Sequence, residues 1–362
     1  MPSSSTPENL STSARQVLIP LNMSQPRVPD SDTHYVNLQG FSMGTSWQVQ
    51  CYLPAAEHDP VSQVEELRVG IQAQLDQVVA QMSPWEADSD LTQFNRAPAN
   101  SWQVLPPEFF KVLQHSVFVA EQTRGAFDPS IGHLANLWGF GPAGKLTQAP
   151  DAVEILQARL RTNWQQIRLN PADSSALQIG DVELDLCSTA KGFGVDQVAR
   201  YLQQIGITSY LVEVGGELRG LGCKPDGQPW WVELEVVPDS TLEQLPIQDF
   251  STSYIVALHG LAVATSGDYN RYFMHEGKRY SHTIDPRTGY PVDHDLASVT
   301  VMHSECMIAD ALATAMSVLG VKKGMAYAKR LHAAARFIER KPDGFVEHLS
   351  PAFIAMTDEH LD

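Results

Sequence analysis

The sequence predicts an α+β fold in which mixed, mainly antiparallel sheets pack against helices. Segments of alternating apolar and polar residues, typical of half-buried strands, follow one another in runs, and amphipathic helical segments are gathered between those runs. A regular alternation of strands and helices would instead favour a parallel sheet. The composition is that of a globular protein with an ample core, because 43% of the 362 residues are hydrophobic and only 19% are charged.

The predicted elements follow in order along the chain. Residues 1–34, rich in Ser, Thr, Pro and Asn, are expected to form a disordered leader before an ordered domain at residues 35–362. That domain begins with a hairpin over residues 35–53, where two alternating segments flank a glycine-containing turn. Residues 90–95 form a short capped turn, and residues 125–144 a long loop with five glycines. Helical spacing, or a proline near the first turn, predicts helices at residues 61–82, 106–123, 151–161, 194–205, 306–319 and 322–332. Strands are predicted at residues 167–169, 176–179, 182–186, 210–214, 230–236, 253–258, 262–265, 298–302, 335–338 and 352–356.

The net charge of −17 argues against a nucleic-acid binder, because neutralising phosphates requires clustered Lys and Arg. It equally disfavours binding to an anionic membrane surface. No apolar run approaches the length of a transmembrane helix. Residues 17–21 are too short for the core of a signal peptide, so no export signal is visible in this chain. A cytoplasmic protein and an exported protein whose signal lies outside this chain are both compatible with the sequence.

Four cysteines are present, and their spacing predicts no zinc site. No two of them form a Cys-x-x-Cys pair, so we expect small buried or half-buried hydrophobic residues, with a disulfide left open. Cysteine usage therefore does not indicate a redox compartment. The four are Cys51, Cys187, Cys223 and Cys306.

The densest chemical signal lies in residues 279–314. Asp310 and Thr314 are four residues apart on a predicted helix, so they share one face, one turn apart. A carboxylate beside a hydroxyl offers two hard oxygen donors, which suit Mg²⁺ or Ca²⁺. His282 and Asp285 lie on a loop shaped by prolines and a glycine. A possible base near a possible metal is typical of metal-assisted phosphoryl transfer.

Three glycine-rich segments, at residues 185–194, 214–219 and 264–268, follow strand-like runs and are interpreted as turns. The first resembles a phosphate cradle, with Lys191 at the start of a helix whose N–H groups and dipole favour an anion. Neither a Walker motif nor Gly-x-Gly-x-x-Gly is present, so a plain strand–helix connection is the alternative.

Each candidate also has a structural interpretation. Asp310 can cap a helix, and a helical threonine such as Thr314 can return its hydroxyl to a backbone carbonyl. A single histidine such as His282 is more often a satisfied hydrogen-bonding residue than a catalyst. Phe127 and Trp138 are more often core or loop anchors than groups that stack on a flavin.

Taken together, these segments resemble the FAD:protein FMN transferases of the ApbE type, also described as thiamine-biosynthesis lipoproteins. The likeness covers eight blocks in the family's order over about residues 35–345, nearly the whole ordered chain. It includes Gly-Ala-Phe-Asp-Pro-Ser, Ala-Lys-Gly and Thr-Ser-Gly-Asp. Any single block is weakly specific, whereas eight in order are strongly specific. The blocks are residues 41–45, 82–95, 125–130, 137–142, 185–196, 214–217, 265–268 and 280–314.

The resemblance implies a flavin transferase fold of two closely packed α+β lobes, with an FAD and metal site between them. It implies that Asp310 and Thr314 are side-chain ligands of Mg²⁺ and that the carbonyl of Ser188 is a third ligand. The positions at which the family contacts FAD are Met43, Trp85, Ala126, Phe127, Asp128, Asp185, Lys191, Ser281 and His282.

By the same resemblance, FAD is a substrate whose FMN moiety is transferred to a threonine or serine hydroxyl of an acceptor protein, with AMP as the leaving group. Asp310 and His282 would be the catalytic residues, and His282 the base that deprotonates the hydroxyl. Activity is then expected to rise through the neutral range, where histidine loses its proton. The acceptor would be a subunit of a membrane redox complex, and the location periplasmic or at the inner membrane.

Two other functions stay open. A hydrolase would use water in place of the protein hydroxyl and split FAD into FMN and AMP. A non-catalytic FAD-binding protein would more naturally lack Asp310, Thr314 or His282, and all three are present. The chain also departs mildly from the family pattern. Residues 187–189, Cys-Ser-Thr, replace smaller residues, and Glu217 stands where Asp is frequent.

Overall fold

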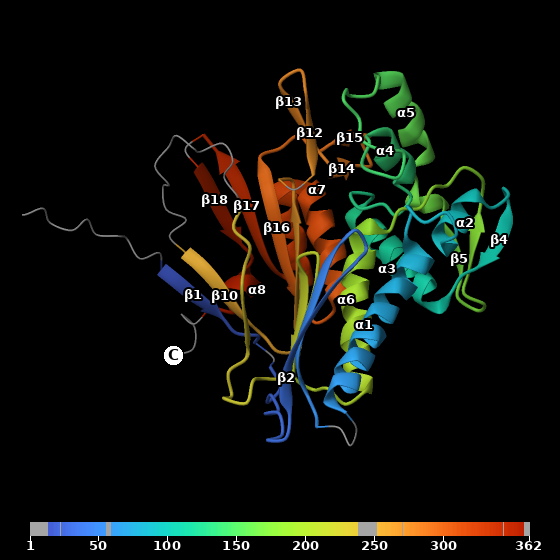
Figure 1. Cartoon of the computed structure of the whole chain (residues 1–362). Coiled ribbons are helices and arrows are strands. Elements are labelled where there is room, and N and C mark those ends of the chain that lie inside the picture. The colour runs from blue at the N-terminus through green and yellow to red at the C-terminus, as the bar shows by residue number, and fades with distance from the viewer. Residues whose placement is uncertain are drawn as a thin grey trace, which may run out of the picture.

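The structure, a computed structural model, confirms the α+β fold and describes residues 14–21, 23–55, 59–237, 252–269, 271–342 and 344–357 (Figure 1). Its centre is an eight-stranded sheet in which every pair of neighbouring strands is antiparallel. The order along the sheet is β18 (Gly344–Leu349), β17 (Ala334–Lys341), β16 (Leu296–His303), β11 (Leu261–Gly267), β8 (Glu217–Leu221), β7 (Tyr210–Val214), β3 (Thr45–Leu53) and β2 (His34–Ser42).

Three helices pack beside this sheet and carry most of the candidate site (Figure 1). They are α1 (Pro60–Met82), α6 (Cys187–Gln204) and α7 (Cys306–Leu331). Helix α6 contacts both of the others, and α7 also packs on β11 and β16. Gly320 bends α7, because its φ of 71° lies outside the helical range. The two helices predicted on either side of that glycine are thus the two segments of one bent element.

The residues between α1 and α6 form a second group of elements, at the right of Figure 1. Their apolar side chains join α1 and α6 in a core that includes Met82, Phe109 and Phe193. The division of residues 35–362 into two lobes stays a prediction. The elements of this group are α2 (Asp90–Arg96), β4 (Ser101–Val104), α3 (Pro107–Thr123), α4 (Gly132–Leu137), α5 (Ala152–Arg161), the short 3₁₀ helix η1 (Trp164–Gln166), β5 (Arg168–Asn170) and β6 (Ser175–Gln178).

The remaining elements lie around these layers. They are a three-stranded sheet of β1 (Ala14–Leu18), β10 (Thr252–Leu258) and β9 (Trp230–Glu233), the hairpins β12 (Tyr272–His275)–β13 (Lys278–Ser281) and β14 (Ile284–Asp285)–β15 (Tyr290–Pro291), and helix α8 (Pro351–Ile354). None of the helices in the described part of the chain combines the length and apolar character needed to cross a bilayer.

The predicted hairpin at residues 35–53 is confirmed as β2 and β3. Its turn consists of Met43 and Gly44, whose φ values of 54° and 73° are both left-handed, which is unusual for methionine. The turn brings Met43 against α6, where a Cβ added to Gly194 would lie 3.1 Å from the methionine sulfur. The hairpin therefore places Met43 at the helical layer that carries the candidate site.

Three segments hold more regular structure than the sequence suggested. Residues 14–18, within the predicted leader, form β1 and pair in parallel with β10, while residues 1–13 lie outside the described part. Residues 90–95 belong to a helix instead of a turn, because the Ser89 hydroxyl caps its first turn. The loop expected at residues 125–144 contains α4.

Two predicted strands are wrong. Residues 182–186 have no strand partner, because their backbone groups bond to a loop and to side chains; the Asp185 N–H, for example, donates to Pro129 O at 2.8 Å. Residues 352–356 lie mostly in α8, which a proline at its first position and the capping hydroxyl of Ser350 both favour.

Two of the three predicted glycine-rich turns are regular elements. Residues 185–194 are mainly the first two turns of α6, which begins at Cys187 and not at residue 194. Residues 264–268 belong almost entirely to β11. The third is a true turn between β7 and β8, with φ values of 60° at Gly215 and 98° at Gly216.

The start of α7 is fixed by a buried carboxylate of α6. Asp196 is fully buried, and its two oxygens accept hydrogen bonds at 3.0 Å from the N–H groups of Cys306 and Met307. The same side chain forms an ion pair with Arg219 of β8. Asp196 therefore satisfies the first donors of α7, complements the positive end of its dipole and ties two helices to the sheet.

Replacing Asp196 should strongly destabilise the fold. Asp196→Ala leaves a guanidinium and two N–H groups buried without partners, and we expect a loss of about 3–5 kcal/mol in unfolding free energy. Asp59 caps the exposed start of α1 through Ser62 N, so Asp59→Ala should cost only about 1 kcal/mol. Urea denaturation, monitored by circular dichroism, gives the unfolding free energies of the two variants for comparison. Equal small losses would show that Asp196 does not anchor α7.

Candidate active site

The candidate site lies where α6 and α7 touch. A Cβ added to Gly192 would lie 2.5 Å from the carbonyl oxygen of Cys306, so only glycine permits this approach. The Gly192 N–H donates to Oδ2 of Asp310 at 3.1 Å. In a regular helix that N–H would donate to the carbonyl of Ser188. The contact therefore joins Asp310 to the turn of α6 that carries Ser188, and Thr314 lies one turn further along α7.

A second charged contact lies beside Asp310. Lys191 Nζ is 2.6 Å from Oε1 of Glu217, whose side chain is almost fully buried at the start of β8. Burial alone would lower the pKa of Lys191, but the charges of Glu217 and Asp310 outweigh it and raise that pKa. Burial raises the pKa of Glu217; the Lys191 ammonium opposes this rise and the charge of Asp310 adds to it. The lysine is therefore a permanent cation between two carboxylates.

A cavity of about 530 Å³ opens next to Lys191. Three of the predicted FAD contacts, Met43, Trp85 and Lys191, line it together with Arg271. Trp85 keeps 51% of its surface exposed, so its ring is free to stack on a planar ligand. The structure thus brings together the Trp85 ring, the Met43 thioether and two cations from four distant parts of the chain.

The other predicted contacts do not line this cavity. Ala126 and Phe127 are buried, and the Phe127 side chain packs in a cluster with Ala311 and Ala315 of α7. Asp128 is also buried, and its oxygens accept hydrogen bonds from Ser130 N, Ser130 Oγ and Trp164 N. These contacts give the loop at residues 126–130 a structural role, and its contact with FAD stays a prediction.

Asp185 links this loop to α6. Its N–H donates to Pro129 O, and its Oδ1 accepts from the N–H of Cys187 at the first position of the helix. Asp185 therefore supports the helix start near the predicted metal ligand Ser188. Its contact with FAD stays a prediction as well.

His282 is half-buried beside the cavity, after the buried Ser281 at the end of β13. Its Nδ1 lies 3.2 Å from the carbonyl oxygen of Arg271. A carbonyl only accepts hydrogen bonds, so Nδ1 carries the proton and the lone pair is on Nε2. Burial, together with the Arg271 guanidinium, lowers the pKa of His282 to about 4. The imidazole is thus neutral near pH 7 in the free protein, and this lowered pKa argues against a rise of activity through the neutral range from titration of His282.

Two site residues lay outside the set predicted from the sequence. Arg271 lines the cavity, donates to Phe140 O at 3.0 Å and holds His282 through its own carbonyl. No spacing rule marks an isolated arginine in this stretch. Glu217 follows two glycines after a strand, and that position is the signal that could have placed it in the site.

The donor set suits a hard cation. Among the described residues, no group of three or more His, Cys, Asp or Glu is arranged to hold a metal. The predicted set is different in kind, with one carboxylate from Asp310, one hydroxyl from Thr314 and one backbone carbonyl. Oε2 of Glu217 is buried without a hydrogen-bond partner among the described residues, and the nearby Asp310 charge helps to raise the pKa of this carboxyl, so a cation would be favoured here. These groups fit Mg²⁺, whose binding stays a prediction.

The cysteines are all free, as expected of small buried residues. Cys187 lines the cavity, yet burial and the nearby Asp185 carboxylate raise the pKa of its thiol. Burial also raises the pKa of Cys51 to about 12. Thiols with raised pKa values are poor nucleophiles, so the site offers oxygen and nitrogen chemistry instead.

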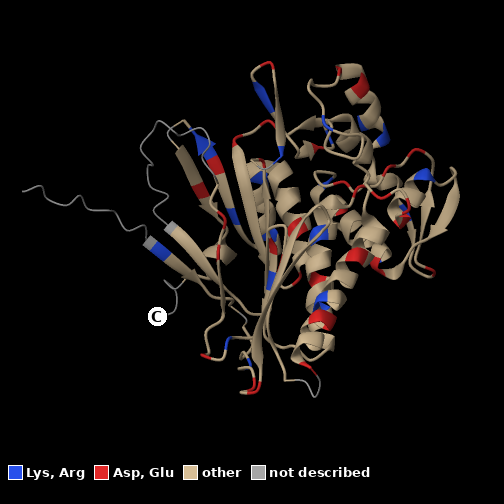
Figure 2. Cartoon of the chain, in the orientation of Figure 1, with Lys and Arg blue, Asp and Glu red and all other residues tan. Residues whose placement is uncertain are grey.

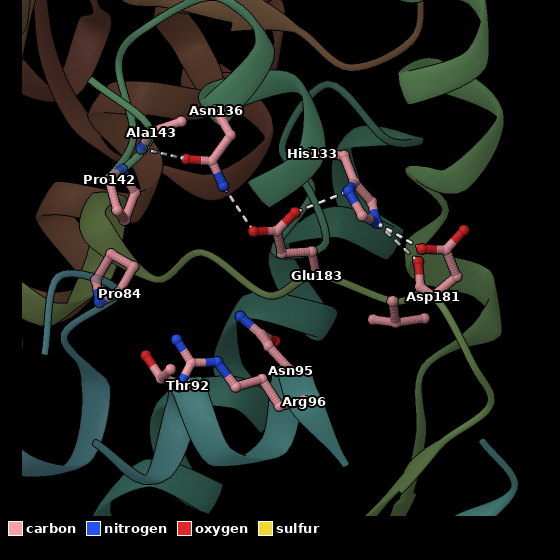
Figure 3. Close-up of a pocket in the computed structure, with 11 residues that line it drawn as sticks. Pro84, Thr92, Asn95, Arg96, His133, Asn136, Pro142, Ala143, Asp181 and Glu183 are labelled. Atoms are coloured by element: carbon pink, nitrogen blue, oxygen red, sulfur yellow. Dashed lines mark hydrogen bonds and ion pairs between the residues drawn. The ribbon is translucent and has the colours of Figure 1, made fainter. Parts of the chain in front are cut away.

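A second cavity of about 460 Å³ lies beside the first, and Pro84 lines both. Figure 3 shows His133 between two acidic residues, with Nδ1 2.7 Å from Glu183 Oε2 and Nε2 2.9 Å from the carbonyl of Asp181. Asn136 donates to the other Glu183 oxygen at 2.6 Å. None of the site residues predicted from the sequence lines this cavity. Its polar contacts hold α4 against the extended segment before α6.

Charged residues elsewhere follow the acidic composition. Figure 2 shows Lys and Arg scattered among Asp and Glu over helices, strands and loops in this view. The paired cations of the candidate cavity are therefore a local feature of an acidic protein.

Comparison with known proteins identifies relatives over most of the chain. The sequence model of the ApbE family matches residues 43–337. The chain is 36% identical to an FAD:protein FMN transferase of Haemophilus influenzae, over 90% of this chain and 93% of that protein. It is also 36% identical to one of Vibrio cholerae, over 88% and 91%. Its structure is similar to that of the apo form of Pseudomonas stutzeri flavinyl transferase ApbE, with a TM-score of 0.78, 36% identity, and coverage of 90% of this chain and 97% of that one.

The protonation of His282 can be measured directly. We expect its imidazole to stay neutral from pH 8 down to about pH 5.5 and to gain a proton near pH 4. The pKa of His133 should be shifted in the opposite direction, because its hydrogen bond to Glu183 raises it, so this ring should gain its proton at a higher pH than His282. Long-range ¹H–¹⁵N NMR spectra, assigned with His282→Gln and His133→Gln, would follow both rings. A His282 resonance that titrates between pH 6 and 7 would contradict the neutral imidazole.

Proposed function

This chain belongs to the ApbE family, and on that premise we propose that it is a Mg²⁺-dependent FAD:protein FMN transferase. The enzyme moves the FMN moiety of FAD onto a threonine or serine hydroxyl of an acceptor protein. A phosphoester forms between FMN and the acceptor, and AMP is released. The flavin is therefore carried as a substrate, and its redox chemistry plays no part in the transfer.

One geometric observation supports this proposal most directly. The Gly192–Asp310 contact accompanies an electrostatic interaction between Asp310 and Lys191, and Lys191 lines a cavity together with Met43 and Trp85. An exposed aromatic ring suits the isoalloxazine, and a cation beside an acidic cation site suits a diphosphate. The same site therefore has separate groups for the two chemically different ends of the FMN moiety.

Asp310, Thr314 and the carbonyl of Ser188 would hold Mg²⁺. When bound, the ion supplies Lewis acidity and neutralises charge on phosphoryl oxygens. Lys191 and Arg271 line the cavity as permanent cations and would neutralise the remaining charge of the diphosphate. These residues make the bridging oxygen of FAD a better leaving group.

His282 is the proposed general base. Its neutral imidazole, with the lone pair on Nε2, can take the proton of the acceptor hydroxyl. The hydroxyl oxygen then forms a bond to the phosphorus on the riboflavin side of FAD. The bond between that phosphorus and the bridging oxygen breaks, and AMP leaves with the bridging oxygen.

A hydrolase is the second candidate, because water could replace the acceptor hydroxyl in the same site and yield FMN and AMP. The relatives named above are transferases, which favours the protein acceptor. A non-catalytic FAD-binding role is disfavoured, because Asp310, Thr314 and His282 are all present and Asp310 contacts the turn that carries Ser188.

We infer from the family resemblance that the acceptor is a flavin-carrying subunit of a membrane redox complex. By the same inference the enzyme works in the periplasm or at the inner membrane. The acceptor contributes a threonine or serine, and nucleic acid is not a partner of this acidic protein.

The metal ligands can be tested by acceptor labelling. Asp310→Ala removes the only full negative charge of the proposed ligand set, so transfer should fall on the order of a hundredfold or more. Thr314→Val should weaken Mg²⁺ binding more modestly, because it removes one neutral donor at nearly constant shape. Ser317→Ala, on the same helix, should retain activity. The measurement is the intact mass of candidate acceptor proteins after incubation with FAD and Mg²⁺. Full labelling by Asp310→Ala in excess EDTA would refute the metal assignment.

Lys191 should distinguish FAD from riboflavin. Because its ammonium is assigned to the diphosphate, which riboflavin lacks, Lys191→Ala should weaken FAD binding clearly more than riboflavin binding. Lys111→Ala, an exposed lysine on α3, should affect neither ligand. Quenching of flavin fluorescence gives both affinities. Equal losses for FAD and riboflavin would show that Lys191 does not contact the diphosphate.

A further inference from the structure

Glu217 has one carboxylate oxygen whose partner is missing. Oε1 accepts from Lys191 Nζ at 2.6 Å, whereas Oε2 is buried and has no hydrogen-bond partner within the part of the chain that the structure describes. The whole residue is only 2% exposed. A buried carboxylate oxygen without a donor costs free energy, so such an atom in a native site calls for a ligand.

The charges around Glu217 indicate the sign of that ligand. Lys191 is a cation beside two acidic side chains, Glu217 and Asp310, and burial raises the pKa of both carboxyl groups. Arg219 does not compensate them, because that guanidinium is paired with Asp196. A cation, or donor groups attached to one, would stabilise the ionised form of both carboxyl groups in this buried position.

The backbone holds Glu217 in place before any ligand binds. The turn at Gly215 and Gly216 connects β7 to β8, and a Cβ on Gly215 would lie 2.7 Å from the Thr45 side chain. The N–H of Gly216 donates to Glu213 Oε1 at 2.7 Å. The carboxylate is thus placed at the end of a rigid hairpin, as a site that must bind an ion with fixed geometry requires.

We propose that Glu217 is a positioning residue of the cation site, in which Oε1 orients Lys191 and Oε2 accepts a hydrogen bond from a water molecule bound to Mg²⁺. This inference rests on the proposed function. Mg²⁺ dehydrates reluctantly and keeps several of its water molecules, whose protons need acceptors. Residues that accept those hydrogen bonds tune the affinity for the metal without touching it. Glu217 thereby adds a second carboxylate to a site whose direct side-chain ligands are Asp310 and Thr314.

Metal affinity measured without FAD tests this role. Mn²⁺ serves as the probe, and the free ion is quantified by electron paramagnetic resonance during titration of the apo protein. Glu217→Gln keeps the shape but removes the charge, and it should weaken Mn²⁺ binding about 10- to 100-fold. Glu217→Asp keeps the charge and should bind Mn²⁺ more tightly than Glu217→Gln. Glu65→Gln, at an exposed carboxylate of α1 that pairs with Arg68, should match the wild type.

A second comparison separates this role from a role through Lys191 alone. In the Lys191→Met background, Glu217→Gln should again weaken Mn²⁺ binding, because Oε2 faces the ion independently of the lysine. No further loss in that background would overturn the inference. Glu217→Ala, with the same expected loss, replaces the glutamine variant if that variant does not fold, and thermal melting checks each protein.

The outcomes also distinguish this inference from the proposed function. Wild-type protein that binds Mn²⁺ and labels an acceptor, together with an unchanged affinity in Glu217→Gln, overturns the role of Glu217 only. Wild-type protein that neither binds Mn²⁺ nor requires Mg²⁺ for labelling overturns the metal assignment, and the role of Glu217 with it.

Discussion

The contact between α6 and α7 is the constraint on which the rest of the site depends. Asp196 of α6 accepts hydrogen bonds from the first N–H groups of α7, and Gly192, one turn earlier, lets the two backbones approach. With the start of α7 fixed in this way, Asp310 lies against the Gly192 N–H, one turn of α7 further on. A shift of either helix would separate the predicted metal ligands, because they come from both. The precision of the site is therefore a result of helix packing and not of a flexible loop.

The site also resolves an electrostatic conflict. The chain carries a net charge of −17, yet its proposed substrate is an anion. Lys191 and Arg271 bring two cations to one cavity, while the adjoining buried position holds two acidic side chains, Glu217 and Asp310, whose pKa values are raised by burial. A divalent cation would stabilise their ionised form and make the position attractive to a diphosphate. On the proposed function, the two acidic side chains would favour a metal ion, and the metal ion would favour the anionic substrate.

Several sequence-based expectations failed for one shared reason. Glycines in residues 185–194 suggested a turn, but in the structure Gly192 permits close packing inside a helix. Residues 182–186 have the pattern of a strand, but their backbone groups bond to a loop and to side chains. A histidine side chain usually titrates near pH 7, but burial beside Arg271 lowers the pKa of His282 and keeps its imidazole uncharged. In each case the residue type is informative, and the role depends on a distant neighbour.

The sequence by itself determined the α+β class, the β2–β3 hairpin, most helices and the family, because local periodicity and ordered motifs are properties of neighbouring residues. It also named Met43, Trp85 and Lys191, which the structure brings to one cavity. Only the tertiary structure decided that Glu217 pairs with Lys191 and that Arg271 lines the cavity and holds His282. Only the fold showed that the loop at residues 126–128 is packed in the core. Such contacts join residues far apart in the chain, and their burial and charge arise only when helices and sheet are packed together.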